Sequence, residues 1–300
     1  MSGVGVLHLA DELGPRGRRR VRIATAIAVA MIGGLVFVAG QRLSDRGQLE
    51  WDKWEPFTQR SVIEFLWGGL ANTLRAAGAA MALALLLGAF LALARLSQTA
   101  PVRWFAAAFV EFFRGVPLIV LIFFCYTGLR AYDVDIAPFR ALVLALAVYN
   151  GAVLGEIFRA GIRSLDSGQS EAAYAIGLSY WQTMLLVVIP QAARRMVPAI
   201  VSQLVTLLKD SSLGFVITVQ DLLRKGRISG EFFGNPLQAL VVVALVYIVV
   251  NLLLGRLARW LEVRQRRRLG AGAMVVSGLE DMSALAAAGT ARVEGDTSRA

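Results

Sequence analysis

Charged residues, histidine and cysteine are all scarce in this 300-residue sequence. Only 17% of its residues are charged and 57% are hydrophobic, whereas soluble domains contain about 25% charged residues. The single Cys125 excludes a disulfide framework within the chain. His8 is also alone, and no group of histidines, cysteines and carboxylates has metal-ligand spacing. The composition therefore predicts a membrane protein that binds no metal.

The apolar residues occur in blocks long enough to cross a bilayer. A membrane-spanning helix needs about 20 apolar residues, and these blocks have no polar face at helical spacing. We predict an all-α fold with six spans, whose approximate limits are Val21–Gly40, Gly69–Leu93, Phe112–Leu129, Phe139–Ile162, Met196–Val219 and Pro236–Arg259. The first block has no clear cleavage site after it, so we expect a retained helix and not a signal peptide.

The net charge of +10 is concentrated beside the apolar blocks. Arginines cluster at Arg16–Arg22 and Arg256–Arg268, a pattern typical of the cytoplasmic face of a membrane and of contact with anionic lipid. No nucleic-acid-binding motif accompanies this charge, so we expect no nucleic-acid partner. We predict that residues 1–20 form a basic cytoplasmic tail, 41–66 an external loop and 263–300 a disordered cytoplasmic tail.

The polar stretch 164–190, between the fourth and fifth spans, contains two predicted helix starts. Capping-box spacing, in which a Gln follows the cap by three residues, begins at Asp166 and again at Ser179. Gly177 lies between them, where a helix can end in a left-handed residue. The pattern predicts a short helix, a glycine turn and a second helix on the cytoplasmic surface, an arrangement suited to docking with another protein.

This stretch resembles the EAA loop of ABC importer permeases, whose pattern is EAA-x3-G-x9-I-x-L-P. The corresponding residues are Glu171, Ala172, Ala173, Gly177, Ile189 and Pro190. Val187 and Ile189 stand where the family has Ile and Leu, and both replacements keep an apolar side chain of similar size. The resemblance implies that these six residues couple the chain to a separate ATPase subunit, which binds ATP and Mg. The chain itself lacks the G-x-x-x-x-G-K-[ST] loop, and no cofactor is expected on it.

Three further segments resemble the polar amino acid permeases of this family: Glu111–Leu118, Gly155–Ile162 and Leu208–Leu213. With the EAA loop they extend the resemblance over about Gly69–Glu262. It implies a five-helix type I importer core at residues 67–262, preceded by one extra N-terminal transmembrane helix at 21–40. The basic tail before that helix is similar to glutamate permease subunits.

The resemblance implies that the chain is a permease subunit of a bacterial inner-membrane importer for polar amino acids, with glutamate as the preferred substrate. Both termini would be cytoplasmic, and the chain would carry out no covalent chemistry. The implied partners are ABC ATPase subunits, a second permease (identical or related) and an extracytoplasmic amino-acid-binding protein. The sequence shows neither the inverted repeats of a secondary transporter nor the filter or charged ring of an ion channel.

Polar residues within the predicted spans are candidates for the substrate path. They are Asn72, Thr73, Asn150, Glu156, Lys209, Asp210, Ser211 and Ser212. The last four interrupt the apolar fifth span. A charge inside a span costs at least about 2.5 kcal/mol, so Lys209 and Asp210 are expected to face protein or water and not lipid.

Each candidate also has a structural interpretation that the sequence leaves open. Residues 209–212 can bond neighbouring helices, and Glu156 can form an ion pair with Arg159 three positions later. The two residues that open the second span can cap its helix. Glu171 in the EAA loop can instead be a favourable charge near a helix amino terminus.

Overall fold

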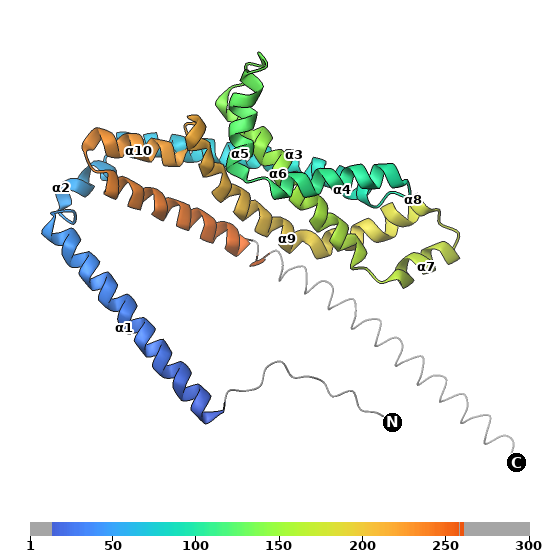
Figure 1. Ribbon diagram of the computed structural model, residues 1–300, viewed down its shortest axis with the longest axis horizontal. Coiled ribbons are helices and arrows are strands. Elements are labelled where there is room, and N and C mark those ends of the chain that lie inside the picture. Colours follow the sequence, from blue (N-terminus) through green and yellow to red (C-terminus); the bar gives the residue numbers. More distant parts are fainter. Residues whose placement is uncertain (1–13, 258, 261–300) are drawn as a thin grey trace, which may run out of the picture. The chain divides into compact units, whose positions relative to one another are not determined.

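The computed structural model describes residues 14–257 and 259–260. In this part of the chain all regular structure is helical, which confirms the predicted all-α fold class (Figure 1). The chain divides into two compact units, Met1–Gln59 and Arg60–Ala300. Among the described residues, five helices are long and apolar enough to cross a membrane, and a bent pair of helices makes a sixth candidate. The predicted tail 263–300 lies outside the described residues.

The first unit contains α1 (Pro15–Asp45), α2 (Trp51–Trp54) and the 3-10 turn η1 (Glu55–Thr58). α1 is strongly apolar and its side chains are exposed along the helix, as expected of a helix that lipid surrounds. The indole nitrogen of Trp54 donates a hydrogen bond to the Gln48 carbonyl at 3.2 Å. The end of α1, α2 and η1 all fall within the predicted loop 41–66, so much of this loop is helical. Its last residues, 60–66, belong to the second unit.

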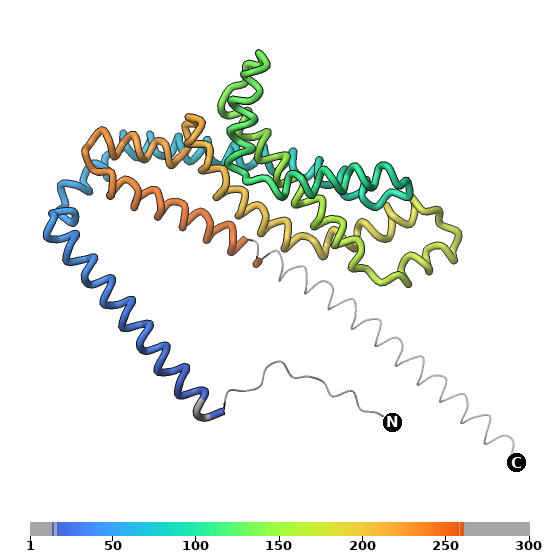
Figure 2. The backbone as a smooth tube through the Cα atoms, in the orientation of Figure 1, coloured from blue at the N-terminus to red at the C-terminus, as the bar shows by residue number. Residues whose placement is uncertain are grey.

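The second unit is built on three long helices, α3 (Arg60–Arg95), α6 (Pro138–Arg163) and α9 (Ile189–Asp210). The shorter helices are α4 (Ala100–Gly115), α5 (Leu118–Phe123), α7 (Ser167–Ala175), α8 (Tyr180–Thr183) and α10 (Leu222–Phe233), followed by a last helix, Pro236–Leu257. Figure 1 shows α10 toward one end of the long helices, and α7 with α8 toward the other. The tube in Figure 2 follows the same path.

α3 and α6 pack closely along a face of small residues. Buried small residues recur every four positions along one face of α3, at Ala76, Ala80, Ala84, Gly88 and Ala92. A Cβ added to Gly88 would lie 2.8 Å from the Cβ of Leu154 and 3.0 Å from the backbone nitrogen of Gly155. The closeness of this contact therefore depends on glycine.

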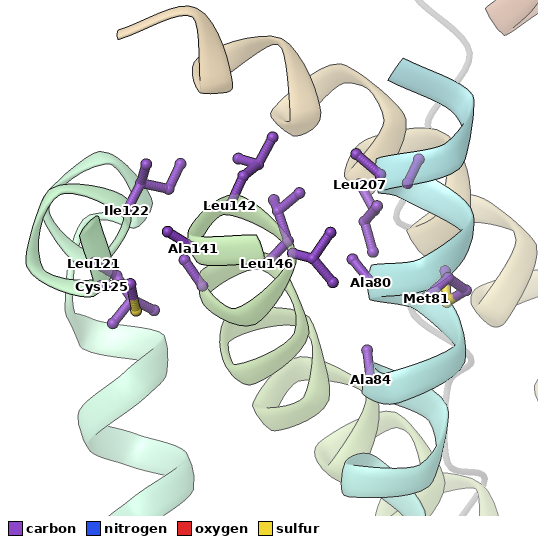
Figure 3. Packing of buried hydrophobic residues seen from close by; sticks show 14 of the residues in the cluster. Ala80, Met81, Ala84, Leu121, Ile122, Cys125, Ala141, Leu142, Leu146 and Leu207 are labelled. Atoms are coloured by element: carbon purple, nitrogen blue, oxygen red, sulfur yellow. The ribbon is translucent and has the colours of Figure 1, made fainter. Parts of the chain in front are cut away.

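A hydrophobic core lies beside this contact and draws on four helices. Leu142 and Leu146 of α6 meet Ala80 of α3, Leu207 of α9 and Ile122 of α5 (Figure 3). Each of these five residues is fully buried. The core thus fixes the α5 segment and α9 on either side of α6.

The predicted third span, Phe112–Leu129, is not a single helix. α4 ends at Gly115, α5 begins at Leu118, and the two helices are bent by 102°. Pro117 has no backbone N–H and favours extended backbone at the residue before it, and Val116 is indeed extended, with φ −77° and ψ 130°. The predicted third span therefore corresponds to a bent pair of helices, because the proline ends the first of them.

The predicted fifth span, Met196–Val219, is the second part of a longer helical segment. α8, the π-helical turn η3 (Met184–Val188), α9 and the 3-10 turn η4 (Ser211–Ile217) continue into one another over Tyr180–Ile217. The segment contains Pro190 and Pro198, neither of which can donate an intrahelical hydrogen bond. The helix that follows the predicted EAA loop is therefore the same helix that carries the polar residues 209–212.

Candidate coupling loop and polar groove

The predicted EAA loop forms a helix, a tight turn and a second helix. α7 ends in a turn in which Gly177 N–H donates to the Tyr174 carbonyl at 2.9 Å and Leu178 N–H donates to the Ala173 carbonyl at 3.1 Å. This pair of bonds requires a left-handed residue, and Gly177 has φ +85°. The predicted glycine turn is confirmed.

One of the two predicted capping boxes is complete. Ser179 N–H donates to Gln182 Oε1 at 2.8 Å, and Gln182 N–H donates to Ser179 Oγ at 3.5 Å. At the first site, Asp166 Oδ1 accepts from Gly168 N–H at 2.9 Å, but the side chain of Gln169 bonds elsewhere. The helix start predicted at Asp166 is confirmed, although its cap is not reciprocal because Gln169 makes a tertiary contact.

That contact fastens the loop to the beginning of α9. Gln191 Nε2 donates to Gln169 Oε1 at 3.1 Å, which joins α9 to α7. Arg195 Nη1 donates to the Ser164 carbonyl at 2.9 Å, which joins α9 to the end of α6. These two hydrogen bonds connect α9 to the loop and to the end of α6 through side chains as well as through the chain itself.

The six predicted coupling residues do not share one environment. Glu171, Ala172, Gly177 and Pro190 are exposed, Ile189 is half-buried, and Ala173 is buried where α7 packs on η3. Glu171 is the fifth residue of α7 and lies beyond its first turn, where a favourable helix-dipole effect has largely decayed. The exposed face of the loop also carries Tyr174, Ile176 and Trp181, three apolar side chains that sequence reasoning missed.

The polar residues 209–212 mark the end of an α-helix and not an interruption within one. α9 ends at Asp210, and η4 begins at Ser211. The Ser211 hydroxyl donates to the Leu208 carbonyl and the Ser212 hydroxyl to the Lys209 carbonyl, each at 2.7 Å. Such bonds satisfy carbonyls near the end of a helix. Ser211 is fully buried, so its hydroxyl is available only to its own helix.

Lys209 and Ser212 line a groove between α9 and the last helix. The groove has a volume of about 590 Å³, and Tyr247 and Asn251 of the last helix contribute its other polar side chains. Lys209 is exposed and, among the residues that the structure describes, is the one charged residue that lines the groove. Its neighbour Asp210 does not line it. Asn251 Nδ2 donates to the Tyr247 carbonyl at 2.7 Å. The sequence analysis missed Tyr247 and Asn251. The pattern that could have found them is two polar residues four positions apart in a mostly apolar span.

Four of the other predicted path residues hold helices together. Asn150 is fully buried and accepts a hydrogen bond from Gln203 Nε2 at 2.6 Å, which links α6 to α9. Glu156 forms the predicted ion pair with Arg159 and a second, at 2.7 Å, with Arg95 of α3. The structure therefore favours the structural interpretation of both residues.

Asn72 and Thr73 tie α3 to the chain just before α10. Thr73 Oγ1 accepts from the Leu222 N–H at 3.1 Å, and Asn72 Nδ2 donates to the Gln220 carbonyl at 2.9 Å. Their interpretation as helix caps was wrong, because α3 begins at Arg60, a dozen positions earlier. Thr73 is also buried, which removes it from any open surface of this chain.

Comparison with known proteins agrees with this arrangement. The family of binding-protein-dependent transport system inner membrane components matches residues 62–267. The chain belongs to this family. It is 42% identical over 234 residues to the glutamate transport system permease protein GluD of Corynebacterium glutamicum, covering 77% of this chain and 84% of that protein. It is 38% identical over 209 residues to the probable glutamine ABC transporter permease protein GlnP of Bacillus subtilis, covering 68% and 94%.

A solved structure of the same family has the same helical arrangement. The crystal structure of an amino acid ABC transporter with histidines matches with a TM-score of 0.65 and 33% identity, over 67% of this permease and 94% of that chain. The predicted type I importer fold is confirmed. α1 lies outside the residues that match the family, as expected for a helix that precedes the permease core.

The beginning of α10 in this permease contains a buried carboxyl group. Asp221 is 1% exposed, and its Oδ1 accepts from the Arg224 N–H at 2.8 Å, which caps the helix. Burial raises the pKa of the Asp221 carboxyl to about 6. A Cβ on Gly69 of α3 would lie 2.9 Å from the Asp221 carbonyl. The cap is therefore enclosed by the same part of α3 that carries Thr73.

Proposed function

We propose that this permease carries glutamate across a bacterial inner membrane, driven by a separate ABC ATPase that docks on the EAA loop. The observation that carries the proposal is the helical segment Tyr180–Ile217. The exposed turn at Gly177 immediately precedes one end of it, and the Lys209 groove lies near the other. Tyr180 and Lys209 are separated by about 44 Å of helix, which is enough to join a cytoplasmic docking surface to the interior of a membrane.

The exposed apolar face of the loop is the proposed contact with the ATPase. Tyr174 and Ile176 offer large side chains of the kind that commonly anchor protein interfaces. Closure of the ATPase on ATP would displace α7 and the turn. The bonds from Gln191 and Arg195 would carry that displacement to α9, and the groove would change where α9 faces the last helix.

Lys209 is the proposed partner of the substrate carboxylate. A hydrogen bond to a charged group contributes about 1.5–3 kcal/mol, more than a neutral one. The groove contains no acidic residue, so it favours an amino acid with a negative or neutral side chain over a basic one. The relative named as a glutamate permease supports glutamate as the substrate.

A second permease is expected to complete the path. Two helical segments line the groove, Tyr180–Ile217 and Pro236–Leu257. In their most apolar 18-residue stretches, only 22% and 17% of the residues are buried within this chain. An identical or related subunit facing this side would enclose the groove. An extracytoplasmic binding protein would deliver the amino acid from the opposite face of the membrane.

Reconstitution tests the proposed transport. The permease is placed in proteoliposomes with its ATPase and binding protein, and uptake of labelled glutamate is measured beside ATP hydrolysis. We expect uptake that requires ATP and is inhibited by unlabelled glutamate more strongly than by arginine. Preferential arginine uptake would reject the substrate, and uptake without the ATPase would support the alternative of a secondary transporter or channel.

Cysteine labelling tests the proposed orientation, with both termini cytoplasmic. Leu49 and Ile176 are 53% and 79% exposed, so cysteines at these positions are reactive, while the native Cys125 is buried. An impermeant maleimide added to intact cells should modify Leu49→Cys and not Ile176→Cys. The reverse pattern would invert the topology.

A further inference from the structure

Two adjoining clefts lie on the side of α3 and α4, at the end nearest the coupling loop. The first has a volume of about 430 Å³ and is lined only by apolar side chains of these two helices. The second has a volume of about 490 Å³ and adds Ser97, Gln98 and Thr99, together with Tyr180 and Trp181 of α8. Both clefts are lined by Phe90, Ala94 and Val102, so they adjoin. We call the pair the channel; its first cleft is apolar and its second has a polar end.

The polar end is positively charged. Arg103 is exposed, and its Nη1 donates to the Ser97 carbonyl at 3.2 Å, which holds the guanidinium at the opening. The segments that line the channel, 87–109 and 180–184, contain no acidic residue. Arg95, the other arginine of these segments, is already paired with Glu156. The opening is therefore complementary to a negatively charged headgroup that Arg103 contacts.

The position of the channel along the helices suits one leaflet of a bilayer. Trp104 and Trp181 beside the polar end are 76% and 61% exposed, and exposed tryptophans are enriched where a membrane meets water. From Pro101 to Phe109, α4 rises about 12 Å. This is most of the roughly 15 Å that one leaflet contributes to the hydrocarbon core.

We infer that α3, α4 and α8 form a binding site for one anionic phospholipid, with an acyl chain between α3 and α4 and the headgroup at Arg103. A free anion would not use the apolar cleft, and a helix of another protein would not need the charged, hydroxyl-rich end. Because Tyr180 and Trp181 belong to α8, the bound lipid contacts the coupling loop itself. Its presence braces α8 against the beginning of α4.

Native mass spectrometry of the permease purified with its partner subunits tests the site. Phosphatidylglycerol and phosphatidylcholine are titrated separately, and we expect one phosphatidylglycerol per permease to survive detergent that removes the rest. Val102 is 45% exposed, so Val102→Trp fills the channel without disturbing buried packing and should abolish this retention. The matched control is Leu86→Trp, at a 71% exposed position of α3 outside the channel.

The headgroup contact has its own test. Arg103→Gln should weaken phosphatidylglycerol retention about fivefold, the effect of removing one arginine near anionic lipid, and leave phosphatidylcholine unchanged. Arg140→Gln, an exposed arginine at the start of α6, should change neither. Inorganic phosphate should not displace the lipid. In nanodiscs, phosphatidylglycerol should raise substrate-stimulated ATP hydrolysis of the wild type and not of Val102→Trp.

Three results would overturn the inference. Equal retention of both lipids by the wild type would show that the site does not recognise the headgroup. Unchanged retention by Val102→Trp would show that the lipid binds elsewhere. Cross-linking of Val102→Cys to a second permease or to α1 would identify the channel as a protein interface. None of these results depends on which amino acid is transported, so they are distinguishable from failure of the proposed function.

Discussion

The two halves of the second unit differ in how completely they are packed. In the most apolar 18-residue stretch of α3 and of α6, 44% and 61% of the residues are buried within the chain. The corresponding values for Tyr180–Ile217 and Pro236–Leu257 are 22% and 17%. α3 and α6 touch backbone to backbone at Gly88 and Gly155, whereas α9 and the last helix leave a groove with a lysine in it. We call α3 and α6 the frame, because their contact is complete within this chain. The second pair leaves more of its apolar surface exposed, and the proposed substrate and second permease would cover it.

The largest expected effect comes from breaking the frame. Gly88→Leu places a side chain where a Cβ alone would lie 2.8 Å from Leu154, and overpacking of this kind costs about 3 kcal/mol or more when backbones must separate. We expect little folded protein by size-exclusion chromatography in detergent. The control is Gly78→Leu on the same helix, where nothing lies within 4 Å of an added Cβ. Equal loss for both variants would mean that the tight contact is unimportant.

The next effect separates coupling from folding. Gly177→Asp adds a charge and a strained left-handed residue to the turn, at a cost of about 1 kcal/mol, and should abolish glutamate uptake and substrate-stimulated ATP hydrolysis. Gly234→Asp provides the control, because Gly234 also has positive φ, at +69°, and open space around it. Both variants should reach the membrane in similar amounts. Normal uptake by Gly177→Asp would remove the loop from the proposed mechanism.

A smaller effect is expected in the groove between α9 and the last helix. Lys209→Met should remove about 1.4 kcal/mol of binding free energy, which corresponds to a tenfold lower affinity. We therefore expect uptake at subsaturating glutamate to fall roughly tenfold. Lys209→Arg should recover part of this uptake. Lys53→Met removes the same charge from α2, and we expect no change. Unaltered uptake by Lys209→Met, together with higher thermal stability, would show that Lys209 lowers stability and does not contact the substrate.

The smallest effect concerns the start of α10. Asn caps a helix about as well as Asp, so Asp221→Asn should leave thermal stability at neutral pH equal or higher, while Asp221→Ala should cost about 1 kcal/mol. Burial raises the pKa of Asp221 to about 6 in the folded state, so this group makes the wild type less stable as pH rises from about 4 to about 6. The Asn variant should lose that slope in thermal melts. An identical slope in both proteins would place the titration elsewhere.

Features encoded by neighbouring residues were accessible from the sequence. The apolar blocks predicted the spans, and the left-handed turn at Gly177 and the box at Ser179 followed from residues within one or two turns of helix. The small-residue face of α3 was equally visible in the sequence. The position of the bend at Pro117 was visible too, but its 102° angle is set by packing against α6.

Contacts between distant residues were not accessible in this way. Thr73 and Leu222 are 149 positions apart, and Asn150 and Gln203 are 53 apart. A polar residue in an apolar span has the same local pattern whether it faces water or another helix. The sequence therefore could not separate path residues from structural ones. The groove residues Tyr247 and Asn251 lie on the last helix, in which the sequence analysis named no candidate.

The uninterrupted segment Tyr180–Ile217 fixes the register between the turn and the groove. Each residue inserted into a helix rotates everything beyond it by about 100°. One extra residue between Pro198 and Lys209 would leave the turn in place and swing the lysine out of the groove. An insertion among the short turns at 46–59 would leave the register between the Gly177 turn and the groove unchanged. In working permeases of this kind, the length of the first segment should therefore be invariant, while the second is free to grow or shrink.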